Sequence, residues 1–148
     1  MSFDPGASQG LRLQEIAPGV QLVQGGTHNS MIVEMRDHLI VFDAPIDDAY
    51  SAWVMEQAAA RYPGKPVRTL VLTHHHMDHA GGVRAYVAQG ATLVVGKGAG
   101  DHFRKVLAAP YTRNPDLAAR NLGGAQIIEV AEKQVFSDGR REVSAHIT

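Results

Sequence analysis

The sequence predicts a layered α/β domain in which strands and helices share one hydrophobic core. Apolar alternation in the first third indicates an antiparallel sheet, and later apolar runs alternate with stretches of helical spacing. A length of 148 residues, with 45% hydrophobic and 20% charged residues, suits one ordinary domain. We expect this domain at residues 11–148, after a flexible N-terminus at residues 1–10 whose small polar residues offer no apolar anchor.

The first part of the chain is typical of an antiparallel sheet followed by a helix. Four short strands are expected, at residues 11–16, 20–23, 31–35 and 39–42. A turn at Pro18-Gly19 separates the first two. Asp47 and Asp48 then offer N-cap oxygens to a helix with apolar residues at helical spacing, which ends before Pro63.

The second part alternates strands with helices and then returns to strands. Strands are expected at residues 67–72 and 91–95, and helices at residues 83–88 and 99–107. A loop at residues 110–115 and a short helix near residues 116–121 come next. The last expected strands lie at residues 127–130, 133–136 and 141–147, with Val143, Ala145 and Ile147 on one face. The chain ends in what reads as mid-strand.

Composition excludes several classes of protein. A formal net charge of -1 gives no overall field that favours nucleic acid or an anionic membrane. Because cysteine is absent, any metal site must use imidazole and carboxylate. No apolar run approaches the roughly 20 residues that cross a bilayer, and the first residues lack the pattern of a signal peptide. We expect a cytoplasmic protein, or a periplasmic or secreted one if a signal peptide was removed.

A histidine cluster lies between a predicted strand and a predicted helix. His74, His75, His76 and His79 fall within six positions, with Asp78 between them. In an extended loop, His74 and His76 face the same side and can hold one ion, while His75 points away. Asp78 and His79, at the edge of the following helix, can hold a second ion.

Imidazole and carboxylate ligands favour zinc, as one or two ions, and also permit iron or manganese. A catalytic metal site needs about three protein ligands and an open position, where bound water loses its proton near neutral pH and attacks a polarised substrate. A chance cluster or a misplaced purification tag is the alternative. Asp78 at a ligand spacing, and the place of the cluster between a strand and a helix, argue against both.

The motif His74-x-His76-x-Asp78-His79, followed by Ala80-Gly81-Gly82, resembles the signature of the metallo-β-lactamase superfamily. The segments at residues 29–33 and 39–45 resemble the same family, in which an aspartate ends a strand beneath the metal loop. The resemblance spans about residues 20–100.

The resemblance implies an αββα sandwich with a binuclear centre at one edge. It implies that His74 and His76 hold the first metal, and that Asp78 and His79 hold the second. Asp78 would also steer the attacking hydroxide as a catalytic residue. Asp43 would orient the loop through hydrogen bonds rather than bind metal, and an aspartate that caps a turn is an equally good interpretation.

The chain departs from the family pattern after His79, since the family needs a third histidine, a bridging aspartate or cysteine and a final histidine. His102 is expected on a helix surface and His146 inside the last strand, so neither is favoured as a ligand. His28 is interpreted as an exposed turn histidine, although its turn could approach the metal cleft. These departures predict that the chain is only the N-terminal half of the sandwich, truncated at the C-terminus.

A half sandwich would expose an apolar sheet face, which predicts a homodimer or a higher oligomer. The leading hypothesis is a metal-dependent hydrolase of a small molecule with an ester, thioester, lactone, amide or phosphodiester bond. No partner nucleic acid or membrane is indicated. The alternative is a truncated, non-catalytic, dimerising remnant of the fold with weak or no metal binding.

Overall fold

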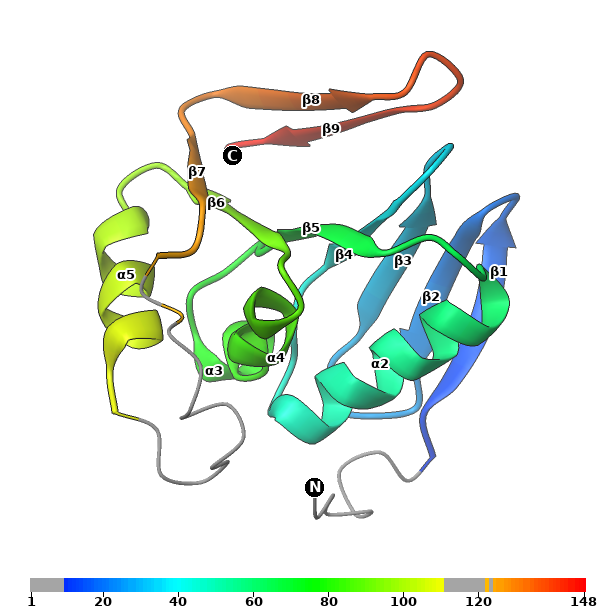
Figure 1. Ribbon diagram of the computed structural model, residues 1–148, viewed down its shortest axis with the longest axis horizontal. Coiled ribbons are helices and arrows are strands. Elements are labelled where there is room, and N and C mark those ends of the chain that lie inside the picture. The colour runs from blue at the N-terminus through cyan, green and yellow to red at the C-terminus, as the bar shows by residue number, and fades with distance from the viewer. Residues whose placement is uncertain (1–9, 111–121, 123) are drawn as a thin grey trace.

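The computed structural model describes residues 10–110, 122 and 124–148 (Figure 1). One mixed sheet contains β1 (Arg12–Ala17), β2 (Val20–Gln24), β3 (Ser30–Glu34), β4 (Leu39–Phe42), β5 (Val67–Val71), β6 (Thr92–Gly96) and β7 (Ile127–Val130), in that order. A separate hairpin contains β8 (Lys133–Ser137) and β9 (Glu142–His146). The helices are α2 (Asp48–Arg61), α3 (Met77–Ala80), α4 (Val83–Ala88) and α5 (Gly100–Ala108).

The direction of the strands changes within the sheet, at the point where the predicted antiparallel strands give way to strands that alternate with helices. β1 to β4 pair antiparallel, through short turns. β4 to β7 pair parallel, because helical segments carry the chain back between these strands. The predicted strands and helices lie within one residue of the observed ones wherever the structure describes them.

Two expectations lie outside the described residues. They are the loop and short helix predicted around residues 111–121, and the flexible N-terminus up to residue 9. One element was not predicted as such. Asp78 and His79 were expected at the edge of the helix at residues 83–88, and they lie instead in a separate short helix, α3. Within the described part of the chain, no helix is both long enough and apolar enough to span a membrane.

The N-terminus of α2 is fixed by its own cap. Asp47 adopts an extended conformation, and its side chain accepts a hydrogen bond from the backbone N–H of Tyr50 at 2.9 Å. This bond satisfies one of the free donors at the start of the helix. α2 begins six residues after the end of β4, and the Ser51 hydroxyl in its first turn donates a hydrogen bond to the backbone oxygen of Gly82, beside the predicted metal loop.

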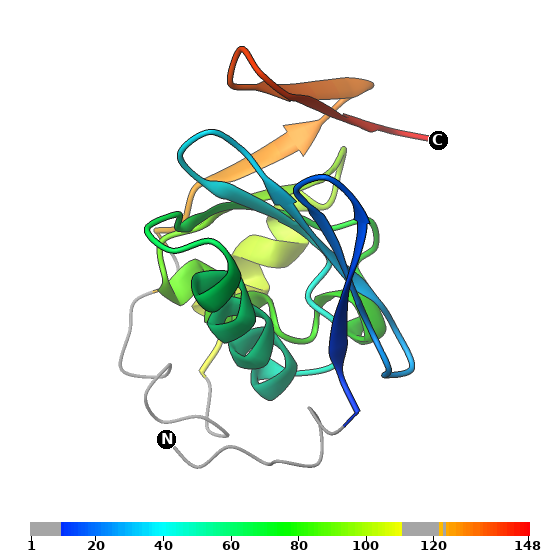
Figure 2. The same ribbon diagram turned by 90° about the vertical axis from the view of Figure 1, so that its right-hand side faces the viewer.

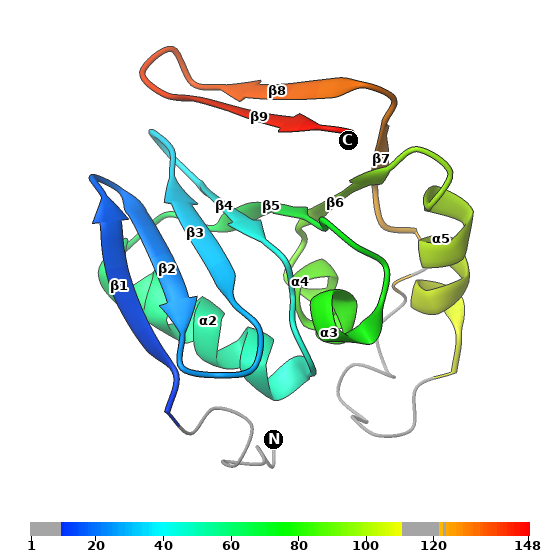
Figure 3. The same cartoon turned by 180° about the vertical axis from the view of Figure 1, so that it is seen from behind.

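The core lies between the sheet and the helices. Alternate strand residues face α2, α4 and α5, and the largest fully buried side chains on this side include Tyr50, Tyr86, Phe103, Ile32 and Leu93. The other face of the sheet carries a second apolar cluster, made of Val33, Met35, Ile40, Val71, Val94 and Val130. Figures 2 and 3 show that β8 and β9 form a layer of their own, apart from the helices.

The apolar sheet face that we expected to be open is largely covered by the chain itself. Phe136, Val143 and Ala145 of the hairpin pack against the second cluster, in which Met35 and Ile40 are fully buried. This corrects the premise on which the predicted homodimer or higher oligomer rested. The oligomeric state itself stays a prediction.

Asp138 fastens the hairpin turn to the main sheet. Its carboxylate accepts hydrogen bonds from the backbone N–H groups of Arg141 at 2.7 Å, Arg140 at 2.8 Å and Arg36 at 2.5 Å. Hydrogen bonds from Arg141 first, and then from Arg140 and Arg36, lower the pKa of Asp138 to about 2. The guanidinium of Arg141 also donates to the backbone oxygen of Gly19 at 3.1 Å. The hairpin is thus bound to two turns of the sheet.

Candidate metal centre

The candidate site lies at the edge where β4 and β5 end. These two strands are parallel, so the residues that follow them meet at one edge of the sheet. Asp43 follows β4, and the histidine loop begins after β5 and leads into α3. The turn between β2 and β3 reaches the same edge, because β3 runs antiparallel to β4.

Asp43 ties the metal loop to the sheet. Its carboxylate accepts hydrogen bonds from the backbone N–H and the hydroxyl of Thr73, both at 2.7 Å, and it lies 3.0 Å from Nδ1 of His79. The residue is buried and has a φ of 62°, a left-handed conformation that aspartate tolerates better than most residues. Through these contacts Asp43 orients the loop, which is one of the two roles considered from the sequence. The contact with Nδ1 also fixes the orientation of the His79 ring.

Gly81 and Gly82 allow the short helices to pack directly on the segment between β4 and α2. A Cβ atom at Gly81 would lie 2.0 Å from the backbone oxygen of Ile46, and one at Gly82 would lie 2.4 Å from that of Asp47. Hydrogen bonds from Ala44 N–H to the His79 oxygen and from Gly82 N–H to the Ala44 oxygen join the two segments. The glycines of the motif are therefore required by close backbone approach.

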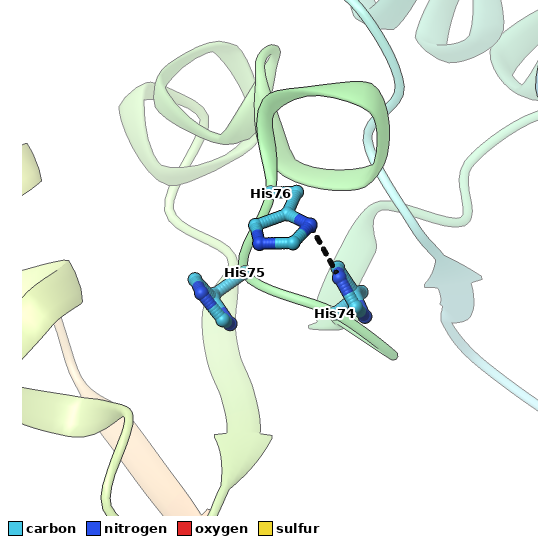
Figure 4. Close-up of side chains that lie close together, drawn as sticks. All are labelled: His74, His75 and His76. Carbon is cyan, nitrogen blue, oxygen red and sulfur yellow. Dashed lines mark hydrogen bonds between the residues drawn. The ribbon is translucent and has the colours of Figure 1, made fainter.

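The first donor group contains three exposed histidines (Figure 4). Nε2 of His74 lies 2.7 Å from Nδ1 of His76, and each of the three rings offers a nitrogen within 4.8 Å of the others. His75 was expected to point away, but its ring stacks on that of His74 with centroids 5.4 Å apart. Lost hydration, and then repulsion from the neighbouring imidazoles, lowers the pKa of His75. That shift favours the neutral form, which binds metal.

The second donor group contains Asp78, His79 and His28. Oδ2 of Asp78 lies 3.7 Å from Nε2 of His79 and 3.2 Å from Nε2 of His28. The His74 and His79 rings have centroids 5.2 Å apart, so the two donor groups are neighbours. The structure thus brings together all four residues predicted from the sequence to bind metal, divided between the two groups as expected.

For His28, the structure favours the second of the two interpretations drawn from the sequence, in which its turn approaches the metal cleft. His28 was interpreted as an exposed turn histidine, but its side chain is 33% exposed and faces Asp78. The ring also lies edge to face against His79, with centroids 5.3 Å apart. The sequence contained a signal for this position. If the strands at residues 31–35 and 39–42 pair antiparallel, the turn before residue 31 lies beside the strand end at residue 42.

The two remaining candidate histidines lie outside both donor groups. His102 is exposed on α5, and its ring contacts those of His75 and Phe103. His146 is the last residue of β9, also exposed, with Nε2 3.0 Å from the hydroxyl of Ser144. Their positions agree with the expectation of a surface helix residue and a strand residue.

The sequence matches the family model of the metallo-beta-lactamase superfamily over residues 23–135. The chain belongs to this superfamily. The match includes the histidine loop, Asp43 and the turn that carries His28. The resemblance inferred from the motif is therefore confirmed, and the metallo-β-lactamase fold accounts for the mixed sheet with helices on one face.

Two proteins similar to this chain are sulfatases. The chain is 34% identical over 86 residues to a linear primary-alkylsulfatase of a Pseudomonas species, which covers 57% of this chain and 13% of that protein. It is 33% identical over 78 residues to an alkyl/aryl-sulfatase of Saccharomyces cerevisiae, which covers 52% of this chain and 12% of that one. The chain thus matches only a small part of either enzyme.

A solved superfamily structure shows the same fold. The metallo-β-lactamase FIM-1 of Pseudomonas aeruginosa, in its mono-zinc form, superimposes with a TM-score of 0.59 at 24% sequence identity. The superposition covers 88% of this chain and 55% of that one. This partial coverage agrees with the prediction that the chain corresponds to a portion of the superfamily fold.

Proposed function

We propose that this chain carries metal ligands of a hydrolase that cleaves a small-molecule ester. The observation that carries the proposal is the pair of donor groups, in which the three residues of each group offer ligand atoms within 4.8 Å of one another. Both groups lie on the segment matched to the superfamily. Such a concentration of imidazole and carboxylate donors on loops held by a sheet is typical of a catalytic metal site.

The donor types fit zinc. The described donors are imidazole nitrogens and carboxylate oxygens, which zinc binds and which iron and manganese also accept. His74 and His76 would hold the first ion, and Asp78 and His79 the second. A bound zinc ion lowers the pKa of a water ligand toward neutrality and so supplies a nucleophile. The mono-zinc form of the Pseudomonas aeruginosa relative supports this choice of ion.

The residues around the donors have separate roles in the proposal. Asp43, 3.0 Å from Nδ1 of His79, holds that ring so that Nε2 faces Asp78. Asp78 is proposed to be catalytic, because its carboxylate lies between two imidazoles and can both bind metal and orient the nucleophile. The first group is exposed, so a small substrate can reach it from solvent.

Alkyl sulfates are the substrate class that we propose to test first. The support comes from the two sulfatases. Each is more than 30% identical to this chain, over a stretch that makes up slightly more than half of the chain. The sulfate group of such an ester carries anionic oxygens, and bound metal cations would attract them. The nucleophile then attacks the electron-poor centre next to these oxygens. Thioesters, lactones, amides and phosphodiesters complete the substrate panel.

The test combines metal analysis with hydrolysis assays on protein purified without a histidine tag. We expect stoichiometric zinc, and turnover of a primary alkyl sulfate or of another member of the panel. A chelator should abolish this turnover, and added zinc should restore it. Metal-free, inert protein would instead support the non-catalytic remnant as the function of this chain.

A further inference from the structure

His28 lies outside the sequence motif, but its side chain belongs to the second donor group. It is carried by the turn between β2 and β3, fifty residues before Asp78. The sequence motif supplies two donors for each ion, whereas a catalytic zinc site takes about three protein ligands. The second ion therefore lacks one donor unless another part of the chain supplies it.

The backbone around His28 is fixed from two sides. The buried hydroxyl of Tyr50 on α2 donates a hydrogen bond to the backbone oxygen of His28 at 3.0 Å. Two residues later, the buried Ser30 hydroxyl bonds to the backbone oxygens of Phe42 at 2.9 Å and of Asp43 at 3.0 Å. The turn is thus held against the same strand end that carries Asp43.

Both nitrogens of the His28 ring have defined neighbours. Nδ1 lies 3.1 Å from the hydroxyl of Thr27, and Nε2 lies 3.2 Å from Oδ2 of Asp78. A histidine that binds metal through one nitrogen commonly uses the other for a hydrogen bond that fixes the ring. Thr27 is placed to make that bond, which leaves Nε2 directed at the second donor group.

We propose that His28 is the third protein ligand of the second ion, together with Asp78 and His79. This inference rests on the proposed function. It is carried by the donor atoms of these residues, which lie within 4.8 Å of one another. A simple ion pair between His28 and Asp78 would explain less, because partly exposed pairs contribute little to stability.

The test measures zinc affinity by competition with a chromophoric chelator, on metal-free wild-type protein and variants of verified fold. His28→Ala is expected to weaken the binding of one ion at least about 10-fold, the range seen when a supporting residue of a metal site is lost. In His28→Gln, the glutamine can still donate a hydrogen bond to Asp78 but is a poor zinc ligand. This variant should weaken zinc binding as much as His28→Ala does. His146→Ala, which removes an exposed histidine outside both groups, should match the wild type.

The outcomes separate this inference from the proposed function. Zinc affinities of His28→Ala that equal those of the wild type would overturn the role of His28 and leave the metal centre intact. Wild-type affinity in His28→Gln alone would also overturn it, because His28 would then act only through its hydrogen bond. Wild-type protein that binds no zinc would overturn the metal centre itself.

Discussion

Replacing Gly81 with alanine is expected to destabilise the fold by about 3 kcal/mol, at the upper end of the usual cost of overpacking. Gly81 has a φ of -60° in the helical region, so alanine causes no backbone strain of its own. The new Cβ would, however, lie 2.0 Å from the backbone oxygen of Ile46 and 2.8 Å from that of Met77. Relief requires movement of the segment before α2, which is already strained at Ile46 with a φ of 66°.

The measurement is the urea or thermal unfolding midpoint of Gly81→Ala beside that of Gly124→Ala. No atom of the described residues lies within 4 Å of the Cβ position of Gly124, and its φ is not left-handed, so alanine there should leave stability within about 0.5 kcal/mol of the wild type. Equal stability of the two variants would mean that α3 does not pack on the segment between β4 and α2.

Replacing Asp43 with alanine is expected to cost about 3 kcal/mol of stability and to lower zinc affinity 10- to 100-fold. The change removes the acceptor for the N–H and hydroxyl of Thr73 and frees the His79 ring. It also places alanine at a φ of 62°, which L-residues other than asparagine and aspartate rarely adopt. Stability is read from chemical unfolding and zinc affinity from chelator competition.

Asp43→Asn is the matched variant for this residue. Asparagine tolerates the same backbone conformation and can still accept the bond from the Thr73 N–H. It lacks the charge that orients the His79 imidazole. We expect most of the stability to return while zinc affinity stays reduced. An Asp43→Ala protein with unchanged stability and zinc affinity would show that the loop is oriented by other residues.

Local chemistry explains why the elements could be predicted from the sequence. The turn at Pro18-Gly19 and the cap at Asp47 mark boundaries that depend only on neighbouring residues, and the structure has strand and helix ends within one residue of them. The histidine loop was predictable for the same reason. Its donors are close in sequence, although the alternation expected for an extended loop placed His75 wrongly.

What escaped prediction depends on contacts between distant segments. His28 reaches Asp78 only because β3 pairs with β4 and Tyr50 anchors the turn. The hairpin that covers the second apolar face is a similar case. Alternation in the last strand placed Val143 and Ala145 on one face, but it did not say that this face would pack on the sheet of the same chain.

We propose above all that the histidine loop gathers metal ions where β4 and β5 end. Anomalous diffraction at the zinc edge, from crystals of zinc-loaded protein, tests it most directly. We predict one peak within about 2.1 Å of nitrogens of His74 and His76, and a second bonded to Asp78 and His79. Zinc-loaded crystals without a peak at either pair, or with zinc bound only at other surface residues, would contradict the account.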